Sequence, residues 1–306
     1  MKKRGVLDNV LPSQIMESQD AEALLESILD TLEQMQDAEG RSKTQTCYQD
    51  GDAGLYEQTI NGCSFADWLY APDNTSGIRK ELVREFGRRI QKSYAIAEPE
   101  YQTLLEKVQS EHCEAELIML IRSDEAHTLY VGTPERFLLA KQWYLSRYVP
   151  KSDFISEAAE CFPNLFFHAD VTSSIHTLNV DFEKERPLIV EHLAALDRFS
   201  EDFLVLRGKN AGNRQMCEEF QKQTQTSGKR LIECSPQSNR ESAKKLDKVF
   251  ADKNGARVSV RCECHTKLKW NFKNMDAEKQ DRIYFSPGLP EIQSGKVLIA
   301  YIGSHL

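Results

Sequence analysis

Apolar residues recur at helical spacing through much of the first two-thirds of the chain. Residues 21–35 and 78–90 place leucine, isoleucine, valine and phenylalanine three and four positions apart. This spacing predicts two amphipathic helices. Further helices are expected to begin at Ser64, Thr133 and Ser152, and to cover residues 187–199, 216–223 and 238–250. The first 16 residues are expected to form a flexible tail, and the polar residues 38–62 a loop.

Short apolar runs between these helices predict β-strands. Residues 117–121 and 128–131 flank a polar connection and are expected to form a hairpin. Strands are also expected at residues 165–167, 203–206 and 230–234.

Polar and apolar residues alternate without interruption over residues 257–270 near the carboxyl end. One face of this segment carries a mostly basic set: Arg257, Ser259, Arg261, Glu263, His265, Lys267 and Lys269. The other face carries Val258, Val260, Cys262, Cys264, Thr266, Leu268 and Trp270. Since side chains alternate across a strand, the pattern predicts one half-buried strand with a basic face in solvent.

Two more strands are expected to follow. Residues 282–285 place Arg282 and Tyr284 on one face, and Pro287-Gly288 then breaks the run. Residues 297–302 are apolar on both faces, as expected of a central strand. His305 stands just beyond them.

These patterns predict an α+β fold in three parts. Residues 1–16 are the tail. Residues 17–200 form an acidic, mostly helical region with a small sheet, suited to regulation or partner binding. Residues 201–306 form a basic domain with an antiparallel sheet, suited to act on nucleic acid.

The distribution of charge supports this division. The chain has a net charge of −8, yet residues 201–306 contain 19 Lys/Arg and 13 Asp/Glu, a net charge of +6. Such asymmetry favours RNA or another polyanion as partner for the basic end. The alternative is that the two parts attract each other or a second protein of the same system.

The eight cysteines follow no repeated spacing, so reduced thiols and a cytoplasmic location are expected. No apolar segment is long enough to cross a membrane. Cys262 and Cys264 alternate away from His265, which argues against a shared zinc site. No cofactor is expected, because neither a P-loop nor a Gly-x-Gly-x-x-Gly motif occurs. No metal is expected, because His-Glu-x-x-His and the Asp/Glu-x-Lys step of metal-dependent nucleases are both absent.

Candidate chemistry gathers on the basic face of the C-terminal strands. His265, Arg282, Tyr284 and His305 are the candidate catalytic residues, because imidazoles move protons near neutral pH and guanidinium groups hold phosphates. Arg257, Arg261, Lys267 and Lys269 are the candidate nucleic-acid contacts. The structural alternative is that these residues only cover the wet face of a sheet.

The ending Arg282-Ile283-Tyr284-Phe285, a turn, and Val297 to His305 resembles the closing hairpin of RelE/ParE-type bacterial toxins. The resemblance covers about 50 of 306 residues. It implies metal-independent RNA cleavage with Arg282, Tyr284 and His305 at the matching positions. The same residues, with His265-x-Lys267, also resemble the ends of uncharacterised bacterial proteins. This resemblance implies a bacterial origin, in phage defence or in mobile elements, but no activity.

A second pattern, Arg186 with His192, resembles the Arg-x(4–6)-His pair of HEPN-type ribonucleases, and Arg122 with His127 shares its spacing. Ordinary helix-surface residues would also explain both pairs. Three hypotheses therefore remain: a toxin-like endoribonuclease, a non-catalytic binding component of a bacterial defence assembly, and a scaffold with no nucleic-acid role.

Overall fold

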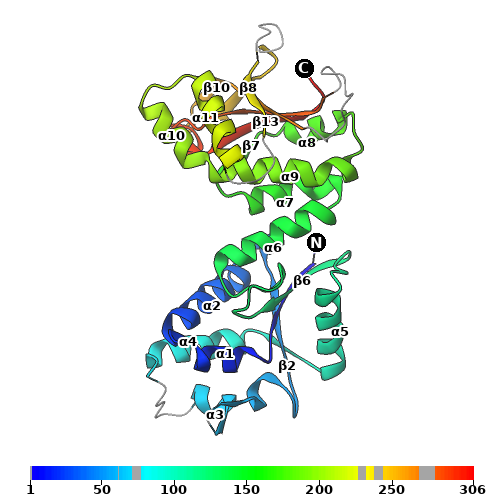
Figure 1. Ribbon diagram of the computed structural model, residues 1–306, viewed down its shortest axis with the longest axis vertical. Coiled ribbons are helices and arrows are strands. Elements are labelled where there is room, and N and C mark those ends of the chain that lie inside the picture. Colours follow the sequence, from blue (N-terminus) through cyan, green and yellow to red (C-terminus); the bar gives the residue numbers. More distant parts are fainter. Residues whose placement is uncertain (1, 61, 71–76, 227–231, 238–243, 269–279) are drawn as a thin grey trace. The chain divides into compact units, whose positions relative to one another are not determined.

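The computed structural model describes residues 2–60, 62–70, 77–226, 232–237, 244–268 and 280–306 (Figure 1). The chain divides into two compact units, Met1–Tyr144 and Leu145–Leu306. The boundary expected near residue 200 therefore lies at residue 144. Residues 145–200 belong with the C-terminal sheet because strand β7 (Leu165–Phe167) pairs with its longest strand, β13 (Val297–Gly303).

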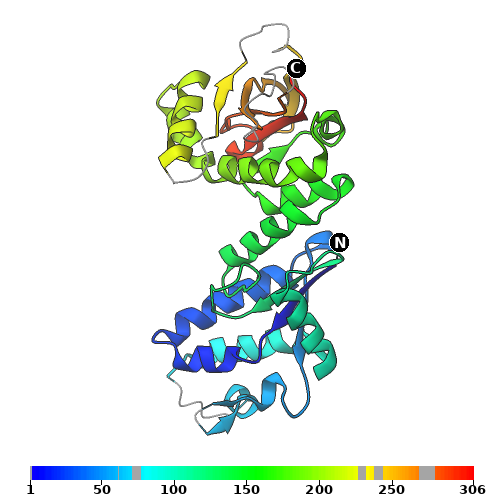
Figure 2. The same ribbon diagram turned by 45° about the vertical axis from the view of Figure 1, so that its right-hand side comes forward.

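Unit 1 is built on a parallel four-stranded sheet in the order β5-β2-β1-β6. Its strands are β1 (Lys2–Leu7), β2 (Gln45–Gln49), β5 (Tyr94–Ile96) and β6 (Glu116–Ile121). Its helices are α1 (Leu11–Glu17), α2 (Ala21–Gln36), α3 (Phe65–Tyr70), α4 (Lys80–Gln91) and α5 (Glu98–Gln109). Figures 1 and 2 show α2 and α4 on one face of the sheet and α5 on the other. Both faces of the sheet are therefore covered.

The helices predicted in unit 1 are confirmed. The predicted tail, loop and hairpin of this unit are wrong. The expected tail contains the central strand β1, and the expected loop contains β2. Strand β1 escapes recognition because three basic residues precede its short apolar end. The expected hairpin is absent from the described residues, where Leu120 and Tyr130 form only an isolated parallel bridge.

Unit 2 contains a five-stranded sheet in the order β7-β13-β12-β11-β8. Strands β8 (Cys234–Pro236), β11 (Cys264–Lys267), β12 (Arg282–Ser286) and β13 pair antiparallel, and β7 pairs parallel to β13. A separate two-stranded sheet joins β9 (Asp247–Ala251) to β10 (Arg257–Arg261). The helices are α6 (Pro134–Arg147), which runs through the unit boundary, α7 (Lys151–Cys161), α8 (Val171–Ser174), α9 (Phe182–Arg198), α10 (Ser200–Gly208) and α11 (Asn213–Thr226).

The predicted strands at 282–285 and 297–302 are confirmed, and β13 is buried on both faces as expected. The predicted strand at 203–206 is wrong. These residues lie in helix α10, where the ring of Phe203 packs against Phe199 at a centroid distance of 4.6 Å. A short apolar run fits a strand or a buried helix equally well, so periodicity could not decide.

The predicted helix at 238–250 is wrong in its second half, although Lys244 is helical. Residues 247–251 form strand β9, and residues 238–243 lie outside the described part.

The predicted continuous strand at 257–270 is wrong as well. It is two strands, β10 and β11, which belong to different sheets. The chain changes partner at Cys262, whose N–H donates to the carbonyl of Leu246. The alternation of polar and apolar residues continues past Cys262, because it reflects the extended backbone. It does not depend on which strand is the hydrogen-bonded neighbour. The prediction of one long basic face therefore fails here.

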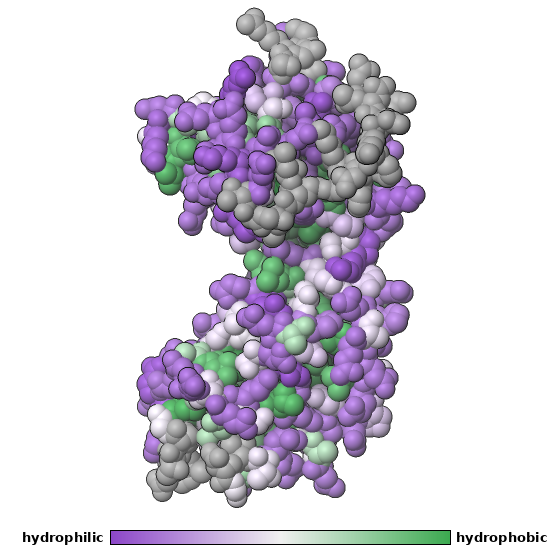
Figure 3. All heavy atoms as spheres, in the orientation of Figure 1, coloured by the Kyte–Doolittle hydropathy of each residue, from purple (hydrophilic) through white to green (hydrophobic). Residues whose placement is uncertain are grey.

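The mixed α+β class is confirmed by both units. Among the described helices, none combines the length and apolar character needed to span a bilayer. Hydrophobic groups on the face shown in Figure 3 occur as separate patches in a mostly hydrophilic surface. The charge contrast follows the units: unit 1 has 15 Lys/Arg and 25 Asp/Glu, a net charge of −10, and unit 2 has 24 and 22, a net charge of +2.

Candidate nucleic-acid interface

Strand pairing in unit 2 brings four of the predicted site residues onto one face. His265 on β11 lies directly opposite Tyr284 on β12, and Lys267 lies opposite Arg282. Directly opposed residues project to the same face of a sheet and lie within contact distance. We call His265, Lys267, Arg282 and Tyr284 the C-terminal cluster.

Short contacts hold the C-terminal cluster together. The rings of His265 and Tyr284 lie 5.1 Å apart between centroids. Arg282 Nη1 donates to the hydroxyl of Tyr284 at 3.4 Å, and that hydroxyl also accepts from the N–H of Leu306 at 3.3 Å. The three predicted residues His265, Arg282 and Tyr284 therefore converge.

Two residues that sequence analysis did not select complete this arrangement. Ser235 Oγ on β8 lies 3.4 Å from His265 Nε2, and the ring of Tyr301 on β13 lies 5.8 Å from that of Tyr284. Tyr301 was the only hydroxyl in the apolar run 297–302, which is a signal that could have marked it. Ser235 carried no such signal.

The C-terminal cluster is buried, in contrast to the solvent-facing strip that alternation predicted. His265 is 3% exposed, Arg282 7% and Tyr284 0%. Only Lys267 reaches the surface, with 29% of its side chain exposed. Neighbouring groups cover this face: the ring of Tyr301 packs on Tyr284, Ser235 lies beside His265, and the N–H of Leu306 donates to the hydroxyl of Tyr284.

Burial changes the acid–base chemistry of His265. Loss of solvation, followed by the positive charge of Arg282, lowers the pKa of His265 to about 3. Lys267 and His305 make smaller contributions to this lowering of the pKa. The imidazole is therefore neutral at neutral pH, and it is a poor match for proton transfer there, which is most efficient when the pKa lies near the working pH.

Arg282 is the unusual member of the C-terminal cluster. Among the described residues its guanidinium forms no ion pair with a carboxylate, and its Nε has no hydrogen-bond partner. Buried charges are normally paired, because an unpaired one loses its hydration without compensation. Lys267, by contrast, pairs with Glu233 at 3.1 Å. The C-terminal cluster therefore holds one uncompensated positive charge.

The remaining predicted residues are spread more widely. His305 is half-buried and close enough to His265 to lower its pKa. Arg257 and Arg261 are exposed on β10, in the other sheet, and Arg261 forms two hydrogen bonds with Asp247 at 2.9 and 3.1 Å. Lys269 lies outside the described residues. The structure therefore does not join Arg257 and Arg261 to the C-terminal cluster.

The HEPN-like pair does not form a site. Arg186 is 6% exposed and donates to the carbonyls of Ser146 and Val149, where α6 ends. His192 is 2% exposed, and its Nδ1 lies 2.9 Å from the hydroxyl of Thr266. Both residues are buried and tie helix α9 to its neighbours.

The second pair with this spacing meets at one ring: Arg122 Cζ lies 4.6 Å from the centroid of Tyr130, and the ring of His127 lies 5.3 Å from it. Arg122 forms ion pairs with Asp8 at 3.2 Å and with Asp124 at 2.8 Å. His127 Nδ1 accepts the N–H of Leu129 in the following loop.

The cysteines predicted to pack in the core do so, and three of them meet. Cys262 and Cys264 are fully buried, which confirms their assignment to the apolar face. Cys217 on α11 hydrogen-bonds with Cys234 and Cys264, and these bonds lower the pKa of its thiol. Among the described residues, no group of three or more His, Cys, Asp or Glu side chains has the arrangement of a metal site.

The carboxyl ends of the parallel strands in unit 1 carry a second polar cluster, which sequence analysis missed. In open α/β sheets, ligands commonly bind at this edge. Here the charges are internally matched: Asp8, which follows β1, pairs with Arg122, which follows β6. Asp8 also accepts from the hydroxyl of Tyr101 at 3.2 Å and the N–H of Val10 at 3.1 Å. This cluster fastens α5 to the sheet.

No protein-family model, curated protein or solved structure matches this chain. The geometry of the described residues is therefore the basis for the functional argument.

Proposed function

We propose that this protein is an RNA-binding, toxin-like component of a bacterial defence system, and that its C-terminal cluster attracts the phosphate backbone. The observation that carries the proposal is the buried guanidinium of Arg282, which has no carboxylate partner among the described residues. An uncompensated charge in a low-dielectric setting produces a strong local potential. A bound phosphate would supply the missing negative charge.

Lys267 and His305 are the contact points in this proposal. Both are half-buried and thus reach solvent, whereas His265, Arg282 and Tyr284 do not. The guanidinium then contributes through its field, while Lys267 donates directly to a phosphate oxygen. The net charge of +6 over residues 201–306 supports the same class of ligand.

Metal-independent RNA cleavage is the second candidate, favoured by the convergence of His265, Arg282 and Tyr284. In such a step the RNA 2′-oxygen attacks the adjacent phosphorus, His265 accepts the hydroxyl proton, and the 5′-oxygen leaves with a proton from water. Acid–base catalysis requires contact within hydrogen-bond distance. Attraction of phosphate acts over a longer range. With His265 3% exposed, the geometry supports binding better than cleavage.

Binding of a labelled single-stranded RNA to the full-length protein, followed by fluorescence anisotropy at several salt concentrations, tests the proposal. Lys267→Met is expected to weaken binding about fivefold and to reduce the salt dependence by about one phosphate contact. Glu233→Gln is expected to tighten binding, because it removes the acid that pairs with Lys267. Lys209→Met, an exposed lysine outside the sheet, is the matched control.

The same assay separates the two candidates. His265→Gln keeps binding in both cases, but it abolishes RNA cleavage only if the imidazole is the base. Binding that is insensitive to salt, or unchanged in both Lys267→Met and Glu233→Gln, would show that the C-terminal cluster does not bind RNA.

A further inference from the structure

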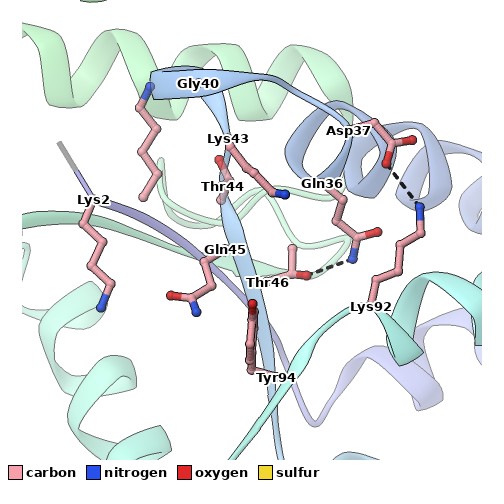
Figure 4. Close-up of a pocket in the computed structure, with 11 residues that line it drawn as sticks. Lys2, Gln36, Asp37, Gly40, Lys43, Thr44, Gln45, Thr46, Lys92 and Tyr94 are labelled. Carbon is pink, nitrogen blue, oxygen red and sulfur yellow. Dashed lines mark hydrogen bonds and ion pairs between the residues drawn. The ribbon is translucent and has the colours of Figure 1, made fainter.

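A pocket of about 660 Å³ opens at the amino ends of the parallel strands of unit 1. The first residues of β1, β2 and β5 line it, together with the last residues of α2 and the residue after α4. Figure 4 shows Lys43, Gln45 and Tyr94 between Lys2 on one side and Lys92 on the other. We call this the amino-edge pocket, and it shares no residue with the C-terminal cluster.

Positive charge dominates the lining. Four lysines contribute to it, and Asp37 is the only acidic residue among the lining residues. Asp37 is already engaged, since its carboxylate contacts Arg89 at 2.6 Å and Lys92 at 3.2 Å. Lys43 is exposed and forms no hydrogen bond or ion pair with any residue that the structure describes. The amino-edge pocket therefore has a cation ready for an anionic ligand.

Two buried polar atoms in the lining lack partners. Gln36 is 8% exposed, and its Nε2 donates to Thr46 Oγ1 at 2.8 Å and to the carbonyl of Arg89 at 2.9 Å. Its Oε1 has no hydrogen-bond partner among the described residues, and neither does Thr44 Oγ1, in a side chain that is 1% exposed. Buried polar atoms are nearly always hydrogen-bonded, so these two mark where ligand groups would bond. The amide oxygen requires a donor, such as a hydroxyl or amino group.

An aromatic ring completes the set. Tyr94 is 61% exposed, the most exposed of the large hydrophobic side chains in the described residues. Exposed aromatic rings beside cations provide a stacking surface for nucleobases. The volume also lies within the usual range of small-molecule sites.

We propose that the amino-edge pocket binds a nucleotide. Lys43 and the neighbouring lysines hold the phosphates, Gln36 Oε1 and Thr44 Oγ1 bond the polar groups of the nucleoside, and Tyr94 stacks on the base. A simple anion would use the lysines alone. A neutral nucleoside would use only Gln36, Thr44 and Tyr94.

Isothermal titration of the full-length protein with ADP, pyrophosphate and adenosine tests this proposal. ADP is expected to bind at least about tenfold more tightly than either fragment, because it engages both sets of groups. Lys43→Met is expected to weaken ADP binding about fivefold, and Lys80→Met, an exposed lysine on α4 outside the pocket, to leave it unchanged. Tyr94→Ala is expected to weaken the binding of ADP but not the binding of pyrophosphate.

Three results would overturn the assignment: no binding of ADP, pyrophosphate as tight as ADP, or ADP binding that neither Lys43→Met nor Tyr94→Ala alters. Both substituted residues are exposed, so the variants are expected to fold, and thermal unfolding verifies this. RNA binding by the C-terminal cluster is measured separately, so either proposal can fail without the other.

Discussion

The C-terminal cluster and the amino-edge pocket both place cations beside a tyrosine, but they differ in exposure. Tyr284 is 0% exposed between two paired strands, whereas Tyr94 is 61% exposed at the beginning of a strand. A side chain in the middle of an internal strand is flanked by side chains of both neighbouring strands and covered by what packs on that face of the sheet. A side chain at the end of a strand lacks some of these neighbours.

This difference separates two ways in which a basic group can act. In the C-terminal cluster, Arg282 is enclosed and has no carboxylate partner among the described residues, so its charge acts through its field. After burial, that charge is the second cause of the lowered pKa of His265. In the amino-edge pocket, Lys43 is exposed and can touch a ligand directly. Residue type alone therefore does not identify the contact residue of a site.

A matched pair of tyrosine substitutions gives the largest expected difference in the free energy of unfolding. Tyr284→Ala removes a fully buried ring and is expected to lower the free energy of unfolding by about 3–5 kcal/mol. Tyr94→Ala removes an exposed ring and is expected to change it by less than about 0.5 kcal/mol. Urea unfolding of the full chain measures both. Similar losses for the two variants would contradict the difference in burial.

The pH dependence of stability tests the enclosure of His265. Its pKa in the folded state is about 3, below the ordinary value of 6.5, so below pH 6.5 the unfolded chain binds a proton that the folded chain does not. The stability that depends on a neutral His265 is therefore fully present above pH 6.5, and it is lost as the pH falls towards 3. Between pH 7 and pH 5 the wild type should lose about 2 kcal/mol more than His265→Gln.

Urea unfolding at the two pH values provides the measurement for His265. Equal losses in the wild type and in His265→Gln would mean that the imidazole titrates normally and is open to solvent.

The smallest expected effect concerns Arg261, which sequence analysis grouped with the C-terminal cluster. Arg261 lies in the other sheet, and both of its hydrogen bonds go to Asp247. Arg261→Met is therefore expected to change the RNA dissociation constant by less than about twofold, because Arg261 lies in a different sheet from the C-terminal cluster. Anisotropy titrations beside Lys267→Met make the comparison. An equal loss in both variants would extend the proposed RNA-binding surface to β10.

Much of the secondary structure followed from local pattern, and the errors have identifiable causes. The amphipathic helices α2 and α4 and the apolar strand β13 were predicted because each has a clear period. Strand β1 was missed because its basic residues resemble a tail, although Lys3 is 2% exposed in the sheet. The run 203–206 was assigned to a strand because four apolar residues carry too little periodicity to exclude a helix.

The candidate site was predicted in part. Alternation correctly placed Arg282 with Tyr284 on one face of their strand, and His265 with Lys267 on one face of theirs. The pairing of β11 with β12 then brings these two faces together. The amino-edge pocket was not predicted, because its residues come from strand and helix ends that are far apart in the sequence.

The sequence by itself determined which residues alternate, which recur at helical spacing and where positive charge collects, because these depend only on neighbours along the chain. Only the tertiary structure decided which strands pair, and hence that Arg282 lies buried with no carboxylate partner in the described part of the chain while Lys43 remains exposed. Solvation and partners depend on residues distant in the sequence, and these set the charge and reactivity of a side chain.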